Sequence, residues 1–326
     1  MRTRSLSEIV LMLVFGEIAL GVIALTACTG KESRVVFDRA GIRVVIDRPI
    51  NRIVSTAPSN TEIIASLGLA DKLVAIDRHS ANVEVPAYCS TGGRPEIPGG
   101  LPLLDFFYPD AEVILGLEPD VIIASGHNPT GSGEDPFRLL REVGIPVVYI
   151  PMSKSIDDIY RDIAFVADLL QVWQKGEEVI AAMKAEVAEI TQRTAHIENK
   201  ATVYFEISIA PEMFTFGRDS FLDSMISSVG ADNIFANDNW IVTPSAEVII
   251  ERNPDVILSN VNYIDDPIGE IKGRPGFGHI SAVINDRVYL IDNDSSSRPS
   301  PGIVLALRQM SYAVYPDDWL ETYDQR

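Results

Sequence analysis

AEVILGLEPDVIIAS, residues 111–125, and AEVIIERNPDVILSN, residues 246–260, align without a gap and are identical at eight of fifteen positions. In each copy a short helical pattern is stopped by a proline, and a run of apolar, mostly β-branched residues follows it. This pattern predicts a helix, a turn and a buried strand in both places. Since the same unit occurs twice, we expect two lobes of similar build, related by an approximate two-fold axis.

Short β-branched runs alternate with helical patterns on both sides of each repeat. In the first half we predict strands at 52–56, 72–76, 121–124 and 147–150, with helices at 61–69 and 136–143 between them. After Lys200 the same alternation predicts strands at 202–207, 256–259 and 288–291 and a helix near 220–229. Strands that alternate with helices form parallel sheets. The predicted fold class is therefore α/β, with two Rossmann-like lobes.

A long amphipathic helix is predicted between the two halves. Residues 177–199 contain neither glycine nor proline, and their apolar positions fall at helical spacing: Ile180, Met183, Val187, Ile190 and Ile197. At 1.5 Å per residue such a helix spans about 35 Å, enough to run the length of a lobe. It predicts a rigid connection, because flexible linkers are rich in glycine, serine or proline.

These patterns divide the chain into four parts. We predict a leader at 1–27, an N-terminal lobe at 28–172, a linking helix at 173–199 and a C-terminal lobe at 200–326. A further helix is expected at 156–170, before the linking helix.

The composition is that of a globular protein with an acidic surface. The 326 residues are 46% hydrophobic and 22% charged, and the formal net charge is −19. A chain of this length usually forms more than one domain. Its charge argues against a nucleic-acid partner, since phosphate binding needs clustered lysines and arginines.

The first 28 residues have the pattern of an exported lipoprotein. Two arginines precede an apolar run over residues 9–27, which ends in Leu25-Thr26-Ala27-Cys28 and so resembles a bacterial lipobox. Cleavage before Cys28 and acylation of its sulfur predict a protein tethered to the membrane on the periplasmic or another extracytoplasmic face. Glu8 and Glu17 are unusual in such a leader, so an uncleaved anchor helix is the alternative.

No dedicated metal site, cofactor or catalytic group is predicted. The four histidines are not at metal-ligand spacing: His79, His127, His196 and His279. Once Cys28 is acylated, Cys89 is the one remaining cysteine, so neither a disulfide framework nor a cysteine-ligated metal is expected. A single axial bond to haem from His79, His127 or Tyr263 is still compatible with these residues.

Residues 52–69, RIVSTAPSNTEIIASLGL, resemble the opening signature of the ABC-importer binding proteins for ferric siderophores, haem and cobalamin. The resemblance extends over essentially the whole mature chain. It is carried further by these segments in order: Glu112 with Pro119-Asp120-Val121, Thr215 to Phe221, Ser245-Ala246-Glu247 with Pro254-Asp255, Ala282-Val283 with Arg287-Val288-Tyr289, and Arg298 to Pro301. It implies a bilobal fold with one rigid helix between the lobes, modest lobe closure, and ligand capture in the cleft.

The resemblance also implies how such a protein meets its transporter. In this family one glutamate on each lobe docks into arginine pockets of the two permease subunits, which are driven by ATPase subunits. Glu112 and Glu247 match those glutamates and occupy the same position in the two copies of the repeat. A carboxylate at the start of a helix is also favoured by the helix dipole, which is a local alternative reason for both residues.

Candidate ligand residues follow the predicted strands, because ligands of α/β lobes meet the loops beyond the carboxyl ends of strands. In the N-terminal lobe they are Ser59, Asn60, Arg78, His79, His127 and Asn128. In the C-terminal lobe they are Phe214, Arg218, Trp240, Tyr263 and Arg298, because aromatic rings form flat walls and arginines pair with anions. Structural alternatives stay open: a helix cap for Ser59, a partner of Asp219 or Glu206 for Arg218, and a core position for Trp240.

The sequence hypothesis is a substrate-binding lipoprotein of an ABC importer that captures a ferric chelate. Cobalamin is the second candidate ligand and haem the third. An enzyme that uses the cleft is the alternative of a different class, since two α/β lobes also occur in metallocluster enzymes; the shortage of cysteines disfavours it. A signalling receptor is disfavoured because the chain shows no output domain.

Overall fold

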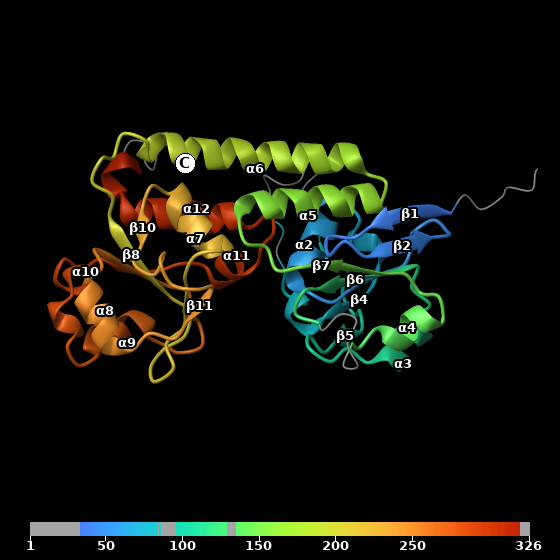
Figure 1. Ribbon diagram of the computed structural model, residues 1–326, viewed down its shortest axis with the longest axis horizontal. Coiled ribbons are helices and arrows are strands. Elements are labelled where there is room, and N and C mark those ends of the chain that lie inside the picture. The colour runs from blue at the N-terminus through green and yellow to red at the C-terminus, as the bar shows by residue number, and fades with distance from the viewer. Residues whose placement is uncertain (1–32, 84, 86–95, 129–134, 320–326) are drawn as a thin grey trace, which may run out of the picture.

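The computed structural model describes residues 33–83, 85, 96–128 and 135–319. Two lobes lie side by side beneath one long helix, as Figure 1 shows. The predicted leader, Cys28 and Cys89 lie outside the described residues. Within the described residues, no helix combines the length and the apolar character needed to cross a bilayer.

The N-terminal lobe is built on a five-stranded parallel sheet with the strand order β5-β4-β3-β6-β7. Its strands are β3 (Ile53–Ser55), β4 (Leu73–Asp77), β5 (Leu103–Leu104), β6 (Val121–Ser125) and β7 (Val147–Ile150). Its helices are α2 (Pro58–Ser66), α3 (Ala111–Gly116), α4 (Arg138–Glu142) and α5 (Ile156–Leu169). Strands β3 and β6 are buried along their whole length, which accounts for their continuous apolar sequences.

An antiparallel hairpin precedes this sheet, β1 (Arg34–Phe37) with β2 (Arg43–Ile46). The parallel pattern read from the sequence did not include it. Its residues alternate between buried and exposed, as expected for a hairpin with one face on the lobe.

The C-terminal lobe has a four-stranded parallel sheet with the order β10-β8-β12-β13. Its strands are β8 (Thr202–Glu206), β10 (Asp232–Asn233), β12 (Val256–Ser259) and β13 (Val288–Leu290), and a small antiparallel pair joins β9 (Thr215–Phe216) to β11 (Ile241–Val242). The helices are α7 (Phe221–Ser228), α8 (Ala246–Arg252), α9 (Pro267–Gly273), α10 (Ser281–Ile284), α11 (Asn293–Ser297) and α12 (Ile303–Val314). The prediction of two α/β lobes with mostly parallel sheets is confirmed.

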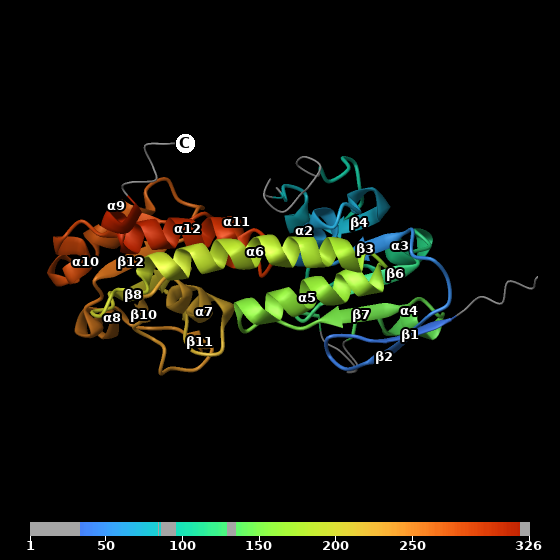
Figure 2. The ribbon, with the colours of Figure 1, turned by 90° about the horizontal axis from the view of Figure 1, so that it is seen from above.

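Helix α6 (Trp173–Thr194) lies along both lobes in the two ribbon views of Figures 1 and 2. Its buried residues Val179, Met183 and Ile190 belong to one apolar cluster that continues from the N-terminal lobe into the C-terminal lobe. An ion pair between Arg308 of α12 and Glu186 of α6 adds a link on the C-terminal side. The helix is therefore part of the core of both lobes.

The amphipathic stretch that predicted this helix, 177–199, differs from the observed bounds, Trp173–Thr194, while the predicted linking helix at 173–199 begins where α6 begins. Gly176 lies inside the helix, facing α5. A Cβ at this position would lie 2.5 Å from the Ala167 Cβ, so glycine allows α5 and α6 to pack closely here. At the other end Ile197 lies in a turn and donates its N–H to the Thr194 carbonyl at 3.1 Å. The chain must turn there to enter β8.

The repeat folds as predicted, as α3 followed by β6 and α8 followed by β12. The aspartate of its Pro-Asp pair makes equivalent hydrogen bonds in both lobes. Asp120 Oδ2 accepts the N–H groups of Asn51 and Arg52 at 2.8 and 3.0 Å, just before β3. Asp255 Oδ2 accepts the N–H and the hydroxyl of Thr202 at 2.9 and 2.8 Å, at the start of β8. Each aspartate thus fastens its unit to the neighbouring strand.

Glu118 and Asn253, the residues before the two prolines, both have left-handed backbone, with φ of 46° and 45°. Asparagine tolerates this conformation, whereas other non-glycine residues lose about 1 to 2 kcal/mol there. We therefore expect Glu118→Gly to raise the free energy of unfolding by about 1 kcal/mol, measured by urea denaturation. Glu177→Gly, on the exposed face of α6, is the control and should lower it by about 1 kcal/mol. A loss of stability in both variants would contradict this account.

Candidate ligand-binding cleft

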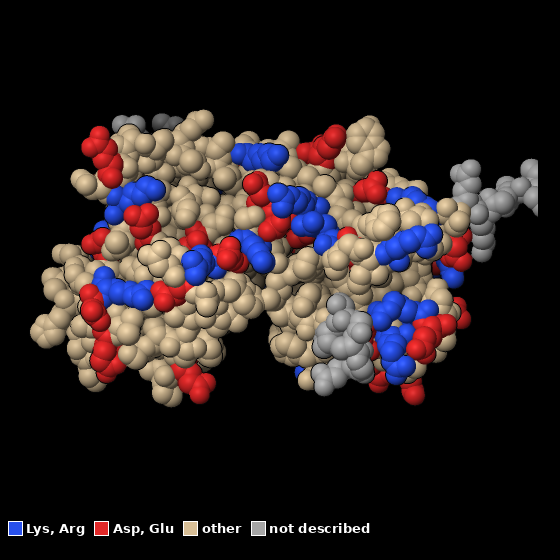
Figure 3. Space-filling model, viewed as in Figure 1, with Lys and Arg blue, Asp and Glu red and all other residues tan. Residues whose placement is uncertain are grey.

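A cleft between the lobes encloses a cavity of about 460 Å³. This volume is within the range of small-molecule sites, about 300 to 1,000 Å³. Figure 3 shows the hollow between the lobes, on the side away from α6, and in this view its borders carry few charged side chains. Both lobes contribute residues to the lining, so a ligand held there touches both.

The cleft lies beyond the carboxyl ends of the central strands. Ser125 and Asn260 line it, and they are the last residues of the two copies of the repeat. Pro58 and Ser59 line it from the start of α2, which follows β3, and Ile207 lines it just after β8. This is the position at which open α/β sheets bind ligands.

Aromatic rings form a wall on each lobe. The lining includes Phe106, Phe107, Phe216, Phe221 and Trp240. On the N-terminal side the Phe106 ring centroid lies 4.9 Å from those of Phe107 and His127, and 5.9 Å from that of His79. On the C-terminal side the Phe216 and Trp240 centroids are 5.6 Å apart. Such rings offer flat apolar surfaces to a large ligand.

The charged residues that line the described part of the cleft already have partners. Arg298 pairs with Asp294 at 2.7 Å, and Asp162 accepts a hydrogen bond from Arg39 Nε at 2.6 Å. Burial lowers the pKa of His127, so its ring is neutral at pH 7, and its Nδ1 lies 2.8 Å from the Ser125 hydroxyl. The cleft as described is therefore apolar with neutral hydrogen-bonding groups.

Six of the eleven predicted ligand residues line this cleft: Ser59, Asn60, His79, His127, Trp240 and Arg298. Trp240 is half-buried in the wall, so it is not a core residue. Asn60 is buried, and its amide donates to the Ile123 carbonyl at 3.3 Å. It therefore also ties α2 to β6.

The other five predicted ligand residues are not part of the lining. Arg78 pairs with Asp105 at 3.2 Å. Arg218 is exposed and donates to Asn239 Oδ1 at 3.3 Å, so neither Asp219 nor Glu206 is its observed partner. Phe214 and Tyr263 are exposed, and the Tyr263 hydroxyl accepts the N–H of Ile209 at 3.2 Å.

Asn128, the fifth of these, lies behind the aromatic wall. It is 1% exposed, and its Oδ1 accepts a hydrogen bond from the Thr56 hydroxyl at 3.2 Å. Its Nδ2 donates to the carbonyls of Phe106 and Phe107 at 3.1 and 3.3 Å. In this structure Asn128 positions the aromatic segment, because its polar atoms are used within the protein.

Sequence reasoning missed the aromatic residues at 106, 107, 216 and 221, and also Asn260. The repeat carried a signal for Asn260, because that residue aligns with Ser125 at the end of a buried strand. Phe106 and Phe107 carried none, since they do not directly follow a predicted strand of the central sheets. Phe216 and Phe221 lie in the segment from Thr215 to Phe221 that carries the family resemblance, but they were not singled out as ligand residues.

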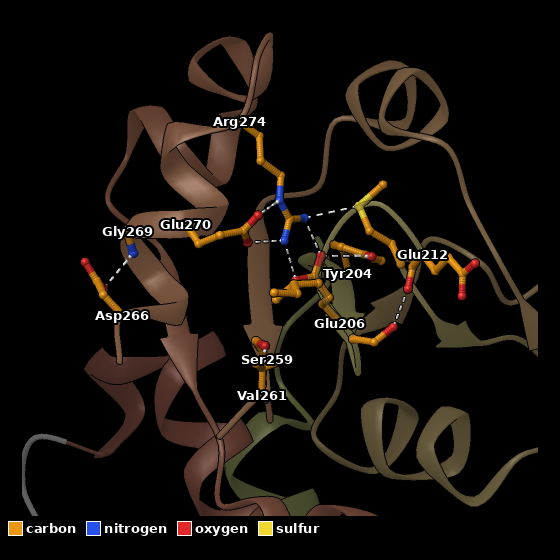
Figure 4. A network of polar contacts seen from close by, with 12 residues as sticks. Tyr204, Glu206, Glu212, Ser259, Val261, Asp266, Gly269, Glu270 and Arg274 are labelled. Atoms are coloured by element: carbon orange, nitrogen blue, oxygen red, sulfur yellow. Dashed lines mark hydrogen bonds and ion pairs between the residues drawn. The ribbon is translucent and has the colours of Figure 1, made fainter. Parts of the chain in front are cut away.

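A buried charged network lies at the end of β8 (Figure 4). Arg274 donates to both carboxylate oxygens of Glu206, at 2.7 and 2.5 Å, and to Glu270 Oε1 at 3.0 Å. The Tyr204 hydroxyl donates to Glu206 at 3.2 Å. Burial raises the pKa of Glu206, and the guanidinium of Arg274 opposes that rise. These hydrogen bonds fasten α9 to β8, next to the cleft residue Ile207.

The chain matches a model of the periplasmic binding protein family over residues 53–295. It belongs to this family. Among curated relatives, it is 26% identical over 286 residues to the uncharacterized ABC transporter substrate-binding lipoprotein YvrC of Bacillus subtilis, with 87% of this chain and 86% of the relative covered. It is 28% identical over 264 residues to the vitamin B12-binding protein of Vibrio cholerae, with 80% and 88% covered.

Solved structures agree with this assignment. A possible iron-binding periplasmic solute-binding protein from Staphylococcus epidermidis superposes with a TM-score of 0.69 at 29% identity, over 82% of this chain and 100% of that one. As a periplasmic binding protein, this chain is a substrate-binding component of an ABC transporter and a partner of permease and ATPase components. Its relatives are transport proteins and not enzymes, which supports the non-enzyme prediction.

The contacts of Asn128 predict a loss of stability when it is truncated. Asn128→Ala leaves the Thr56 hydroxyl and two carbonyls without their partner, so the free energy of unfolding should fall by about 1 to 3 kcal/mol in urea denaturation. His79→Ala is the control, because its exposed ring is not itself a hydrogen-bond donor or acceptor in the described contacts, and it should cost less than about 0.5 kcal/mol. An equal small effect from both would show that Asn128 does not hold the aromatic segment.

Proposed function

We propose that this binding protein captures a bulky metal complex of low net charge and delivers it to the permease, with a corrinoid as the first candidate. The observation that carries the proposal is the cleft lining, which combines aromatic walls with neutral polar groups and paired charges. The sequence hypothesis ranked a ferric chelate first; the lining favours the reverse order, with haem still third.

The net charge of the ligand distinguishes a ferric chelate from a corrinoid. A ferric triscatecholate is strongly anionic, and burying it calls for several arginines or lysines that are free to pair with it. Among the described lining residues Arg298 is the one arginine or lysine, and it is already paired with Asp294. A corrinoid presents a macrocycle with neutral amides around its rim. Aromatic rings and the side chains of Ser59, Asn260 and Asn293 suit those groups. Relatives named vitamin B12-binding proteins support this order.

Tryptophan fluorescence tests the ligand. Trp240 lines the cleft, whereas Trp173 begins α6 and the Trp319 ring stacks on Arg193. Cyanocobalamin should quench the emission, the quenching should be much weaker in Trp240→Phe, and Trp173→Phe should behave as the unmodified protein. Equilibrium dialysis measures binding independently of the signal. Tight binding of ferric triscatecholate or hemin without binding of cyanocobalamin would overturn the choice of ligand.

We also propose that Glu112 and Glu247 dock this protein onto its permease, and that acylated Cys28 tethers it to the membrane. Both glutamates are exposed in the first turn of their helices, α3 and α8. These helices lie on different lobes, away from α6 (Figure 1). A hydrogen bond from Ser245 lowers the pKa of Glu247, which keeps it ionised for an arginine partner. The lipoprotein name of the Bacillus relative supports the tether.

Docking predicts that transport and capture separate in mutants. Glu112→Ala and Glu247→Ala should leave ligand affinity unchanged, since neither residue lines the cleft, and each should weaken coupling to the permease by about 2 to 5 kcal/mol. Uptake by proteoliposomes that contain the transporter measures the effect. Glu251→Ala, exposed on α8, is the control and should transport normally. Normal uptake by the double mutant would refute the docking role.

A further inference from the structure

A carboxylate of one lobe is buried against the backbone of the other. Glu62 lies in α2 of the N-terminal lobe and is 3% exposed. Its Oε1 accepts the N–H of Gly302 at 2.6 Å, and Gly302 precedes α12 in the C-terminal lobe. The buried Ser300 hydroxyl lies near the same carboxyl and lowers its pKa. Two groups of the C-terminal lobe thus converge on one side chain of the N-terminal lobe.

Glycine at 302 allows this close approach. A Cβ at that position would lie 2.8 Å from Glu62 Oε1, too near for a side chain unless the carboxyl moved. The contact therefore needs both residues: a carboxyl at position 62 on α2 and a glycine at position 302 opposite it.

A second bond crosses between the lobes at the same segment. Arg298 Nη2 donates to the His79 carbonyl at 3.3 Å, and Arg298 is held by Asp294 on its own lobe. Arg298 and Pro299 line the cleft from the C-terminal lobe, while Pro58, Ser59 and Ile63 line it from around α2. The crossing bonds thus join the segment from Arg298 to Gly302 to α2 and to His79, which also lines the cleft.

We propose that Glu62 is a positioning residue for ligand capture, a latch that fastens the segment from Arg298 to Gly302 onto α2 and so fixes the separation of the cleft walls. This inference rests on the proposed use of the cleft for a ligand, but its test below needs none. A failure of the test therefore differs from a failure of the ligand assignment.

The latch has a pH dependence that follows from its burial. Desolvation raises the pKa of Glu62 from 4.5 to about 7; hydrogen bonds from Ser300 and Gly302 and the charge of Arg298 oppose the rise, and Asp294 adds to it. The Glu62 carboxyl binds a proton more tightly when its contact with Gly302 is closed than when it is open. Protonation therefore stabilises the closed contact fully below pH 4.5, and this stabilisation is lost as the pH rises through 7.

Other charged groups near this segment come from the elements packed around α2. Asp77 and His79 lie near Arg298, and burial raises the pKa of Asp77. From α5, Asp162 is buried and bonded to Arg39. The comparison of Glu62 with a neutral isostere separates its titration from theirs.

Hydrogen exchange at the Gly302 amide, followed by NMR and corrected for the intrinsic rate, tests the latch in the ligand-free protein. In the unmodified protein the protection factor should fall about tenfold between pH 6 and 8. In Glu62→Gln it should stay constant over that range, because the amide oxygen still accepts the Gly302 N–H and does not titrate. Glu62→Ala should lose at least about tenfold in protection at both pH values.

Glu142→Gln, an exposed change on α4, is the matched control and should keep the fall seen in the unmodified protein. The latch is refuted if Glu62→Gln shows the same tenfold fall, or if the unmodified protein shows none. Should Glu62→Ala fail to fold, the comparison of the Gln variant with the unmodified protein still decides the question.

Discussion

The apolar stripe of α6 is the interaction on which the rest of the structure depends. Val179, Met183 and Ile190 are buried in a cluster that belongs to both lobes, so the lobes cannot separate along this helix without exposing core side chains to water. In two-lobed proteins whose lobes are joined by flexible hinges, the lobes can open widely. Here the cleft is formed between bodies that share a core on the opposite side, and it is largely preformed.

Much of the fold was predictable because its signals are local. The repeat, the buried strands and the stripe of the long helix follow from periodicity and from where prolines stand. The observed bounds of α6 depend on tertiary packing, which the sequence pattern does not show. Gly176, which that pattern left out, lies in the helix where α6 packs against Ala167 of α5, and residues 195–201 lead from the helix into β8. The β1–β2 hairpin was missed because its alternation is short.

The site was predictable only in part from the ends of strands. Ser59 and His127 follow β3 and β6 and line the cleft, but Asn128, one residue beyond His127, is buried behind it. Neighbouring positions in a loop can face opposite ways, and sequence does not say which. The aromatic wall at 106 and 107 belongs to a segment held by Asn128, twenty-one and more residues away, a contact that only the folded chain reveals.

The repeat unit also connects the cleft mechanically to the outer surface. Each copy begins with a helix that presents Glu112 or Glu247 to solvent and ends at Ser125 or Asn260 in the cleft wall, and Asp120 or Asp255 fixes the unit to the central strand. Each copy is therefore a short lever. Any rotation of one lobe about α6 that narrows the cleft also changes the spacing of the two outer helices, so the distance between Glu112 and Glu247 is tied to the width of the cleft.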